Sequence, residues 1–197
     1  STRDDLIRQA GAAPLTPQGL QDLARLEQQV RQQQVATIGE AGSAAVLAAI
    51  ATRRGEIGAA IRDEAIGEVR AVPATLQGAQ MLDRLGQQAR QQHAAAIGEA
   101  GVSAVLAAIE TRRGEIGAAI RDRLLASIAG LPANLNSLQA LYGIETQLAP
   151  PVAALMGSDG AATVRRAAAA RRGVLGAEVG TAVVREIGAA PIEPGTF

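Results

Sequence analysis

Hydrophobic residues recur at steps of three and four along most of the chain, with polar residues between them. One such stripe runs from Leu20 to Val30, and a second runs from Val46 to Ile61. This spacing places the apolar side chains on one face of an α-helix. Strand-forming aromatic residues make up only 1% of the chain, which argues against a sheet. The pattern predicts an all-α fold.

The two stripes return with a fixed period. Residues 53–63 recur unchanged as residues 112–122, and 112 − 53 = 59. Only six of 33 positions differ between residues 31–63 and 90–122. A degenerate copy begins at Arg171, one further period along the chain, since 171 − 112 = 59. The chain is therefore predicted to form three tandem helical-hairpin repeats that share one core, as an elongated helical bundle or an α-solenoid.

Prolines mark the boundaries of these repeats. Pro14, Pro73, Pro132 and Pro191 follow the same 59-residue period, and proline interrupts a helix. The lead before the first boundary is polar and is expected to form one helical turn. The predicted parts are an N-terminal lead (1–13), repeat 1 (14–72), repeat 2 (73–131), a degenerate capping repeat 3 (132–190) and an extended C-terminal tail (191–197).

Each repeat is expected to contain two helices. In repeat 1, Thr16 and Pro17 suit the start of the first helix, and the Gly39/Gly42 pair is expected to close it. Ser43 is a good cap for the second helix, which is expected to run to about Arg70. In repeat 3, Pro150 and Pro151 are expected to kink or stop the first helix, and residues 157–160 mark the turn.

Two glycines lie inside each second helix, where each costs roughly 1 kcal/mol relative to alanine. They either break the helix, which would make three helices in each repeat, or allow another helix to approach closely. We expect one continuous helix, because no Pro, Asn or Ser accompanies them. The candidate helix-packing glycines are Gly55, Gly58, Gly114 and Gly117.

Composition limits the function classes. The 19 basic and 19 acidic residues balance, so no net field attracts nucleic acid or an anionic membrane. The absence of Cys excludes disulfides and thiolate chemistry. No apolar stretch follows the charged residues 1–5, and Pro132 interrupts the longest charge-free run, residues 124–144. We therefore expect neither a signal peptide nor a transmembrane segment, and a location in the cytoplasm or in a particle assembled there.

No constellation predicts catalysis. His93 is the only histidine, and no cluster of ligands accompanies it, so no metal site is expected. The Gly39/Gly42 and Gly55/Gly58 pairs lack the Lys and the Ser or Thr of a phosphate-binding loop. No catalytic residue, cofactor or metal is assigned, and the chain is expected not to be an enzyme.

Paired arginines flank the second stripe of each repeat and lie opposite residues 28–34 in the predicted hairpin. Three interpretations stay open: a polar layer that fixes helix register, contacts with acidic groups of a partner or second copy, or binding of an anion. Nucleic acid would favour positive net charge and stacking aromatics, which the chain lacks. The candidate partner or register contacts are Arg53, Arg54, Arg112, Arg113, Arg171 and Arg172.

These observations predict a structural role rather than a catalytic one. The expected function is that of a scaffold protein, a building block of a larger bacterial or bacteriophage assembly such as a virion. Its expected partner is a second copy of itself, in a homo-oligomer, or another protein of the same assembly. The alternative is a monomeric binding module that recognises another protein. Binding to a membrane surface, an anion or nucleic acid is a lower-ranked alternative.

Overall fold

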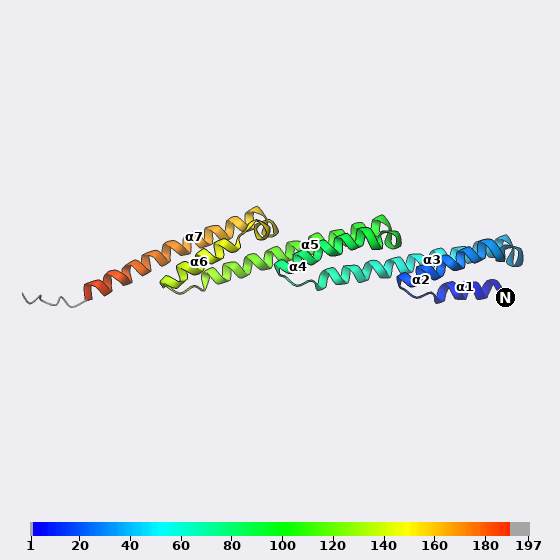
Figure 1. Cartoon of the computed structure of the whole chain (residues 1–197), viewed down its shortest axis with the longest axis horizontal. Coiled ribbons are helices and arrows are strands. Elements are labelled where there is room, and N and C mark those ends of the chain that lie inside the picture. Colours follow the sequence, from blue (N-terminus) through cyan, green and yellow to red (C-terminus); the bar gives the residue numbers. More distant parts are fainter. Residues whose placement is uncertain (1, 190–197) are drawn as a thin grey trace, which may run out of the picture. The chain divides into compact units, whose positions relative to one another are not determined.

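The protein is all-helical. The computed structural model describes residues 2–189, apart from the side chains of residues 33, 34 and 189. It is 92% helical, and the described part contains no strand, so the all-α prediction is confirmed. The predicted tail, 191–197, lies outside the described residues. The elements are α1 (Thr2–Ala12), α2 (Pro17–Gln29), η1 (Val30–Gln34), α3 (Val35–Ala71), α4 (Leu76–Gln88), η2 (Ala89–His93), α5 (Ala94–Ala129), α6 (Leu135–Gln147) and α7 (Pro150–Ala189) (Figure 1).

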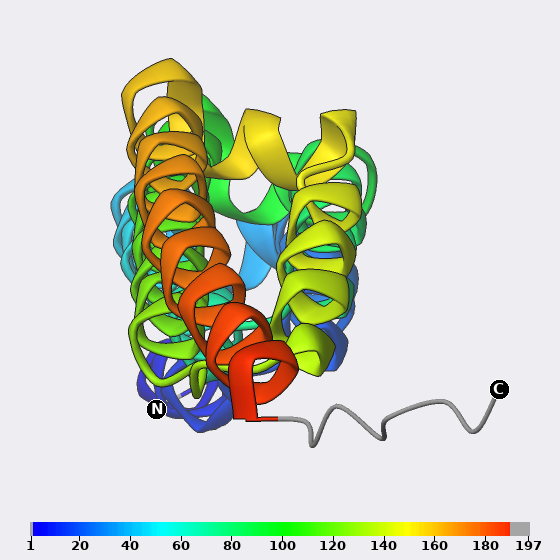
Figure 2. The same ribbon diagram turned by 90° about the vertical axis from the view of Figure 1, so that its left-hand side faces the viewer.

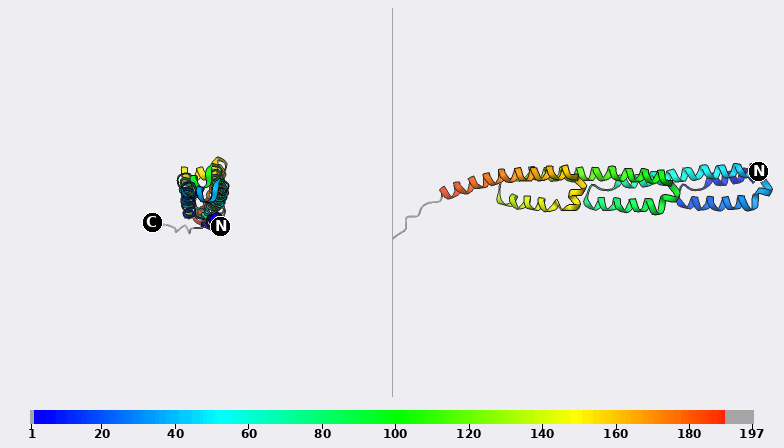
Figure 3. Two further views of the ribbon diagram at one scale, coloured as in Figure 1. Left: turned by 90° about the vertical axis from the view of Figure 1, so that its right-hand side faces the viewer. Right: turned by 90° about the horizontal axis from the view of Figure 1, so that it is seen from above.

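The chain divides into two compact units. The first contains Ser1–Val72 and Gln77–Arg112, and the second contains Pro73–Leu76 and Arg113–Phe197, described up to residue 189. In the first unit, α2 lies beside the first half of α3 (Figure 3). In the second unit, α6 lies beside α7 (Figure 2). Each of these pairs is a helical hairpin.

One glycine makes the turn at the start of each long helix. Gly39 has φ 73° and ψ 172°, a combination that essentially only glycine adopts, because a Cβ atom would collide with the backbone. Gly98 (φ 68°) and Gly157 (φ 71°) repeat this conformation with the period of the sequence. The helix-closing role expected for Gly39 and the turn expected at residues 157–160 are both confirmed.

A second glycine, three residues later, makes room for a side chain. A Cβ atom on Gly42 would lie 3.0 Å from Cβ of Ile38, and one on Gly101 would lie 2.6 Å from Cβ of Ile97. The apolar residue before the turn therefore folds back over the new helix. The Gly-x-x-Gly pattern is thus a turn element with two separate functions.

Two local predictions for the first hairpin are wrong. Ser43 does not cap the second helix, because the helix resumes directly after Gly39 and Ser43 is buried inside it. The first helix also does not reach Gly39 as regular α-helix. It passes through the π-helical segment η1, whose counterpart η2 lies one sequence period later. π-helical segments are rare and mark a local departure from regular packing.

Other helix ends agree with the sequence. Thr16 occupies the N-cap of α2 in an extended conformation, with Pro17 in the first turn. Asn134 caps α6, because its Oδ1 accepts a hydrogen bond from the backbone N–H of Ser137 at 3.0 Å. The helix α6 ends at Gln147, and α7 begins at Pro150, so the expected interruption at the two prolines is confirmed.

The predicted polar lead is in fact part of a core. Helix α1 covers 11 residues, which is about three turns, whereas one turn was expected. Leu6, Ala10 and Ala13 are buried against α2 and α3. The sequence did contain a signal for this helix. Arg3, Asp4 and Pro14 each lie 59 residues before Arg62, Asp63 and Pro73, so the lead repeats the end of the second helix of repeat 1.

Each unit has its own hydrophobic core. The first gathers Leu23, Val46, Ile50 and Ile57 with the buried face of α1. The second gathers residues of α5, α6 and α7, including Leu141, Val164 and Leu175. Full burial of one such side chain stabilises the fold by about 1.5–3 kcal/mol. Because alanine supplies many of the remaining contacts, each large side chain carries much of the stability.

The long helices continue through their internal glycines, as expected. In α3, only Gly39 has a non-helical conformation. A Cβ atom on Gly58 would lie 2.6 Å from the carbonyl oxygen of Ala96, and one on Gly117 would lie 2.0 Å from that of Leu155. These two are packing glycines, as predicted. The same prediction is wrong for Gly55 and Gly114, because a Cβ atom there would meet no neighbouring atom within 4 Å.

Replacing these glycines by alanine should separate the two kinds. Gly58→Ala forces a methyl group against a backbone carbonyl, and we expect it to destabilise the protein by about 1–3 kcal/mol. Gly55→Ala adds a methyl group in open space and should stabilise it by up to about 1 kcal/mol. Thermal unfolding followed by circular dichroism measures both. A Gly58→Ala variant that melts at or above the wild-type temperature would contradict the packing role.

Candidate functional site

The first arginine of each pair holds the end of an earlier helix. Nε and Nη2 of Arg53 donate hydrogen bonds to the carbonyl oxygen of Ala13, at 2.9 and 2.5 Å. Arg112 contacts the carbonyl of Val72 in the same way, at 3.0 and 2.5 Å, and Arg171 reaches that of Leu131 through Nη2. Each acceptor lies 40 residues earlier in the chain.

These carbonyls lie at the ends of α1, α3 and α5. The last carbonyls of a helix have no partner within that helix, and a cation near them is favoured by the helix dipole. Ala13 is only 6% exposed, and Val72 only 2%, so water has little access to replace the arginine. The guanidinium therefore caps the helix end and fixes its position along the next long helix.

The second arginine of a pair binds a carboxylate on the facing helix. Nη2 of Arg54 lies 2.6 Å from Oε2 of Glu27, and Nη2 of Arg172 lies 2.5 Å from Oε2 of Glu145. The position halfway between these two glutamates, 59 residues after Glu27 and 59 before Glu145, is Gly86. Arg113 therefore has no glutamate at the equivalent position. Glu27 lies one residue before the stretch 28–34 that the predicted hairpin placed opposite the arginines.

The Glu27 carboxylate is held in its charged form. The hydrogen bond from Arg54 lowers its pKa most, and a second hydrogen bond from Arg31 acts in the same direction. Partial burial opposes both by raising the pKa, and the net result is a pKa below the ordinary 4.5. The two arginines therefore bind an ionised Glu27 at neutral pH.

Metal-ligating side chains do not gather in the described part of the chain. This part contains no group of three or more His, Asp or Glu side chains placed to hold a metal ion. His93 lies half-buried in η2, with Nε2 3.2 Å from Nε2 of Gln88. This contact to a neighbouring turn supports the interpretation of His93 as a local substitution rather than a ligand.

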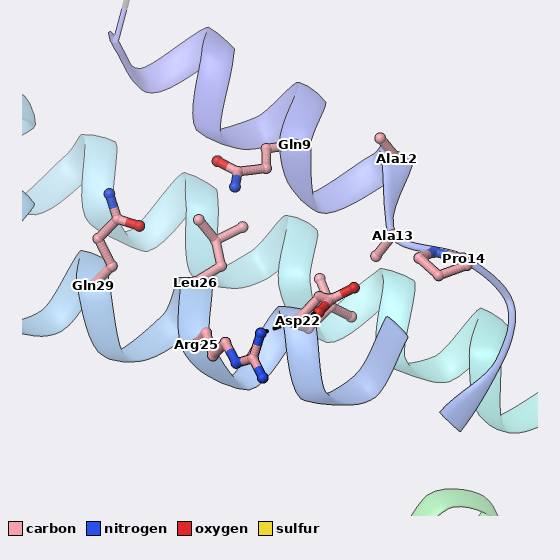
Figure 4. A pocket seen from close by; sticks show the side chains of 9 residues that line it. Gln9, Ala12, Ala13, Pro14, Asp22, Arg25, Leu26 and Gln29 are labelled. Atoms are coloured by element: carbon pink, nitrogen blue, oxygen red, sulfur yellow. Dashed lines mark ion pairs between the residues drawn. The ribbon is translucent and has the colours of Figure 1, made fainter. Parts of the chain in front are cut away.

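A surface depression separates α1 from α2 (Figure 4). Gln9 borders it from α1, and Asp22, Arg25 and Gln29 border it from α2. Asp22 and Arg25 form a loose ion pair, with Oδ1 and Nη1 3.8 Å apart. The polar lining therefore consists of two amides and this ion pair, and the rest of the lining is apolar: Ala12, Ala13, Pro14, Leu23 and Leu26.

Two helical stretches, Val35–Ala71 and Leu76–Ala129, are long and apolar enough to pass for membrane spans by length and composition alone. Core helices of water-soluble proteins satisfy the same criterion. Both stretches include a glycine turn with non-helical geometry and several paired arginines. The apolar windows are 22% and 17% buried in the structure, and length and composition alone do not decide whether these stretches lie in a membrane.

The chain matches no protein-family model, and no curated protein or solved structure matches it either. The functional argument therefore rests on the contacts of its own residues. The contacts described for Arg53, Arg54, Arg171 and Arg172 lie within the chain. They support the interpretation in which the arginines fix register, and a role of these residues in binding a partner stays a prediction.

Removing one capping arginine should cost more than removing an exposed one. Arg53→Ala leaves the buried carbonyl of Ala13 without its donor, and we expect a loss of about 1–3 kcal/mol. The matched control is Arg62→Ala, which removes only an ion pair to the adjacent Asp63 and should change stability by less than about 1 kcal/mol. Urea unfolding measures both. Equal midpoints for the two variants would refute the capping role.

The Glu27 pKa makes part of the stability dependent on pH. Because folding lowers this pKa, the ionised carboxylate stabilises the folded state above pH 4.5, the ordinary value. That contribution is lost as the pH falls below 4.5 and through the lowered folded value. Glu27→Gln should therefore melt below wild type at pH 7, and the difference should shrink in acid. A difference that is independent of pH would show that the charge contributes nothing.

Proposed function

We propose that this protein is a non-enzymatic helical scaffold in which three tandem hairpins of about 59 residues stack as an α-solenoid. In this proposal it is a building block of a larger bacterial or bacteriophage assembly. The observation that supports it best is the recurring joint, in which an arginine caps the helix end 40 residues earlier at Arg53, Arg112 and Arg171.

A recurring joint has a mechanical consequence. The ends of α1, α3 and α5 are each fastened by an arginine of the hairpin that follows, and each turn uses the same pair of glycines. A chain built this way extends by adding equivalent units, since each unit needs contacts only with its neighbours. Such an arrangement supplies length and regularly spaced surfaces, which a scaffold requires, and it needs no enclosed pocket.

Exposed apolar residues support a role in association. Leu135 and Tyr142 on α6 are 65% and 69% exposed, and Val184 and Ile187 on α7 are 70% and 71% exposed. Large apolar side chains that gather on a surface are typical of contact sites with other proteins. The two exposed residues of α6, Leu135 and Tyr142, also favour the second candidate function. In that function the protein is a monomeric module that binds another protein through α6.

The mass in solution separates the two candidates. A scaffold that binds its own copies should show a weight-average mass that rises with concentration well above the 20.0 kDa of one chain. Multi-angle light scattering during size-exclusion chromatography, repeated at several loading concentrations, measures this. A constant mass of one chain at every concentration would reject self-assembly and leave the binding module.

A further inference from the structure

The last third of α7 exposes an apolar stripe that is buried wherever else it occurs. Val183 and Ile187 are 45% and 71% exposed. The residues 59 positions earlier, Leu124 and Ile128, are only 7% and 3% exposed. The residues a further 59 positions earlier, Ala65 and Val69, are 9% and 0% exposed. The stripe on α7 has no such cover, because no described helix of its own unit lies beside this end in Figures 1 and 3.

The packing glycine of α7 is uncovered as well. Gly58 and Gly117 each face the carbonyl oxygen of a residue just before the next glycine turn, Ala96 and Leu155 respectively. Gly176 follows Gly117 by one period, since 176 − 117 = 59. A Cβ atom on Gly176 would meet nothing within 4 Å. In the described chain, Gly176 therefore lacks the contact that Gly58 and Gly117 make with the tip of the next hairpin.

The first hairpin of the chain has the complementary features. By the same step, Thr37 takes the place of Ala96 and Leu155. Thr37 and Ile38 border an open depression together with Thr2 and Arg3, the start of α1. The tip of this hairpin thus meets the beginning of α1, where the tips of the later hairpins meet a packing glycine.

Helix α1 occupies the position of a long-helix end. Leu6 and Ala10 precede Val183 and Ile187 by three periods, since 183 − 6 = 187 − 10 = 3 × 59. Both lie in the core formed with α2 and α3. The segment 179–189 has the same length as α1, 11 residues. The end of α7 therefore matches the groove that α1 fills, with a larger side chain at one position, Ile187 for Ala10, and a slightly smaller one at the other, Val183 for Leu6.

We propose that the end of α7 of one copy binds the groove between α2 and α3 of a second copy, in place of that copy's α1. This inference rests on the proposed scaffold function and names its partner and geometry. Since the two surfaces differ, each bound copy leaves a free α7 and a free groove, and such a heterologous contact extends into chains unless its rotation closes a ring.

The exchange sets α1 against α7. Helix α1 is tethered to its groove, which gives it an effective concentration of roughly millimolar. The end of α7 brings Ile187 where α1 has Ala10, and it adds the contact at Gly176. Helix α1 is therefore an internal competitor. At low concentration it occupies the groove of its own copy, and the end of α7 of a second copy displaces it when the concentration rises.

Four variants of this 197-residue chain test the exchange by sedimentation velocity over a range of concentrations. Val183→Asp with Ile187→Asp charges the α7 stripe and should weaken association at least tenfold. Leu6→Asp loosens α1 and should strengthen it at least tenfold. Val174→Asp is the matched control: Val174 is 46% exposed and lies on the opposite face of α7, nine residues before Val183, so association should not change.

The fourth variant combines Leu6→Asp with both α7 changes and should be monomeric. If this variant still associates, the exposed groove binds other copies without the α7 stripe, and the proposal is overturned. If the variant with both α7 changes associates as strongly as the wild type, this docking is overturned, while the scaffold function remains in place. A wild-type chain and a Leu6→Asp variant that are both monomeric at every concentration overturn both the docking and the scaffold function. Circular dichroism of each variant confirms that its helices are intact before the masses are compared.

Discussion

The contact between an arginine and a helix-end carbonyl is the constraint on which the rest of the structure depends. A helix that stops at a proline leaves its last carbonyls without partners, and Ala13 and Val72 are too buried for water to serve them. Arg53 and Arg112 supply two donors each from the middle of the next long helix. This pairing joins the end of one helix to the middle of the next long helix, 40 residues later in the chain.

Glycine sets the second constraint. The turn at Gly39 uses a backbone conformation closed to other residues, and Gly42 leaves the volume that Ile38 fills. Gly58 brings a helix into contact with a bare backbone carbonyl. The thin core is a consequence: where backbones approach this closely, alanine and glycine fit and aromatic side chains do not.

The two ends of the described chain carry complementary features. Helix α1 fills a groove that elsewhere receives the end of a long helix, whereas the end of α7 exposes the matching stripe. This uncovered end and this occupied groove, related by the sequence period, are the two surfaces through which we propose that copies associate. The position of the glutamates adds variation, since Glu27 and Glu145 bind arginines where Gly86 cannot.

The sequence by itself determined the helical class, the 59-residue period, the continuity of the long helices and the break before Pro150, because periodicity, glycine and proline act locally. It did not determine the role of Arg53, whose partner is a carbonyl 40 residues away, nor distinguish Gly58 from Gly55, which differ only in what packs against them. It also left α1 as a polar lead, although Arg3-Asp4 repeats Arg62-Asp63. Its two buried core residues, Leu6 and Ala10, form too short a stripe to be recognised alone, and only the groove that buries them reveals a helix.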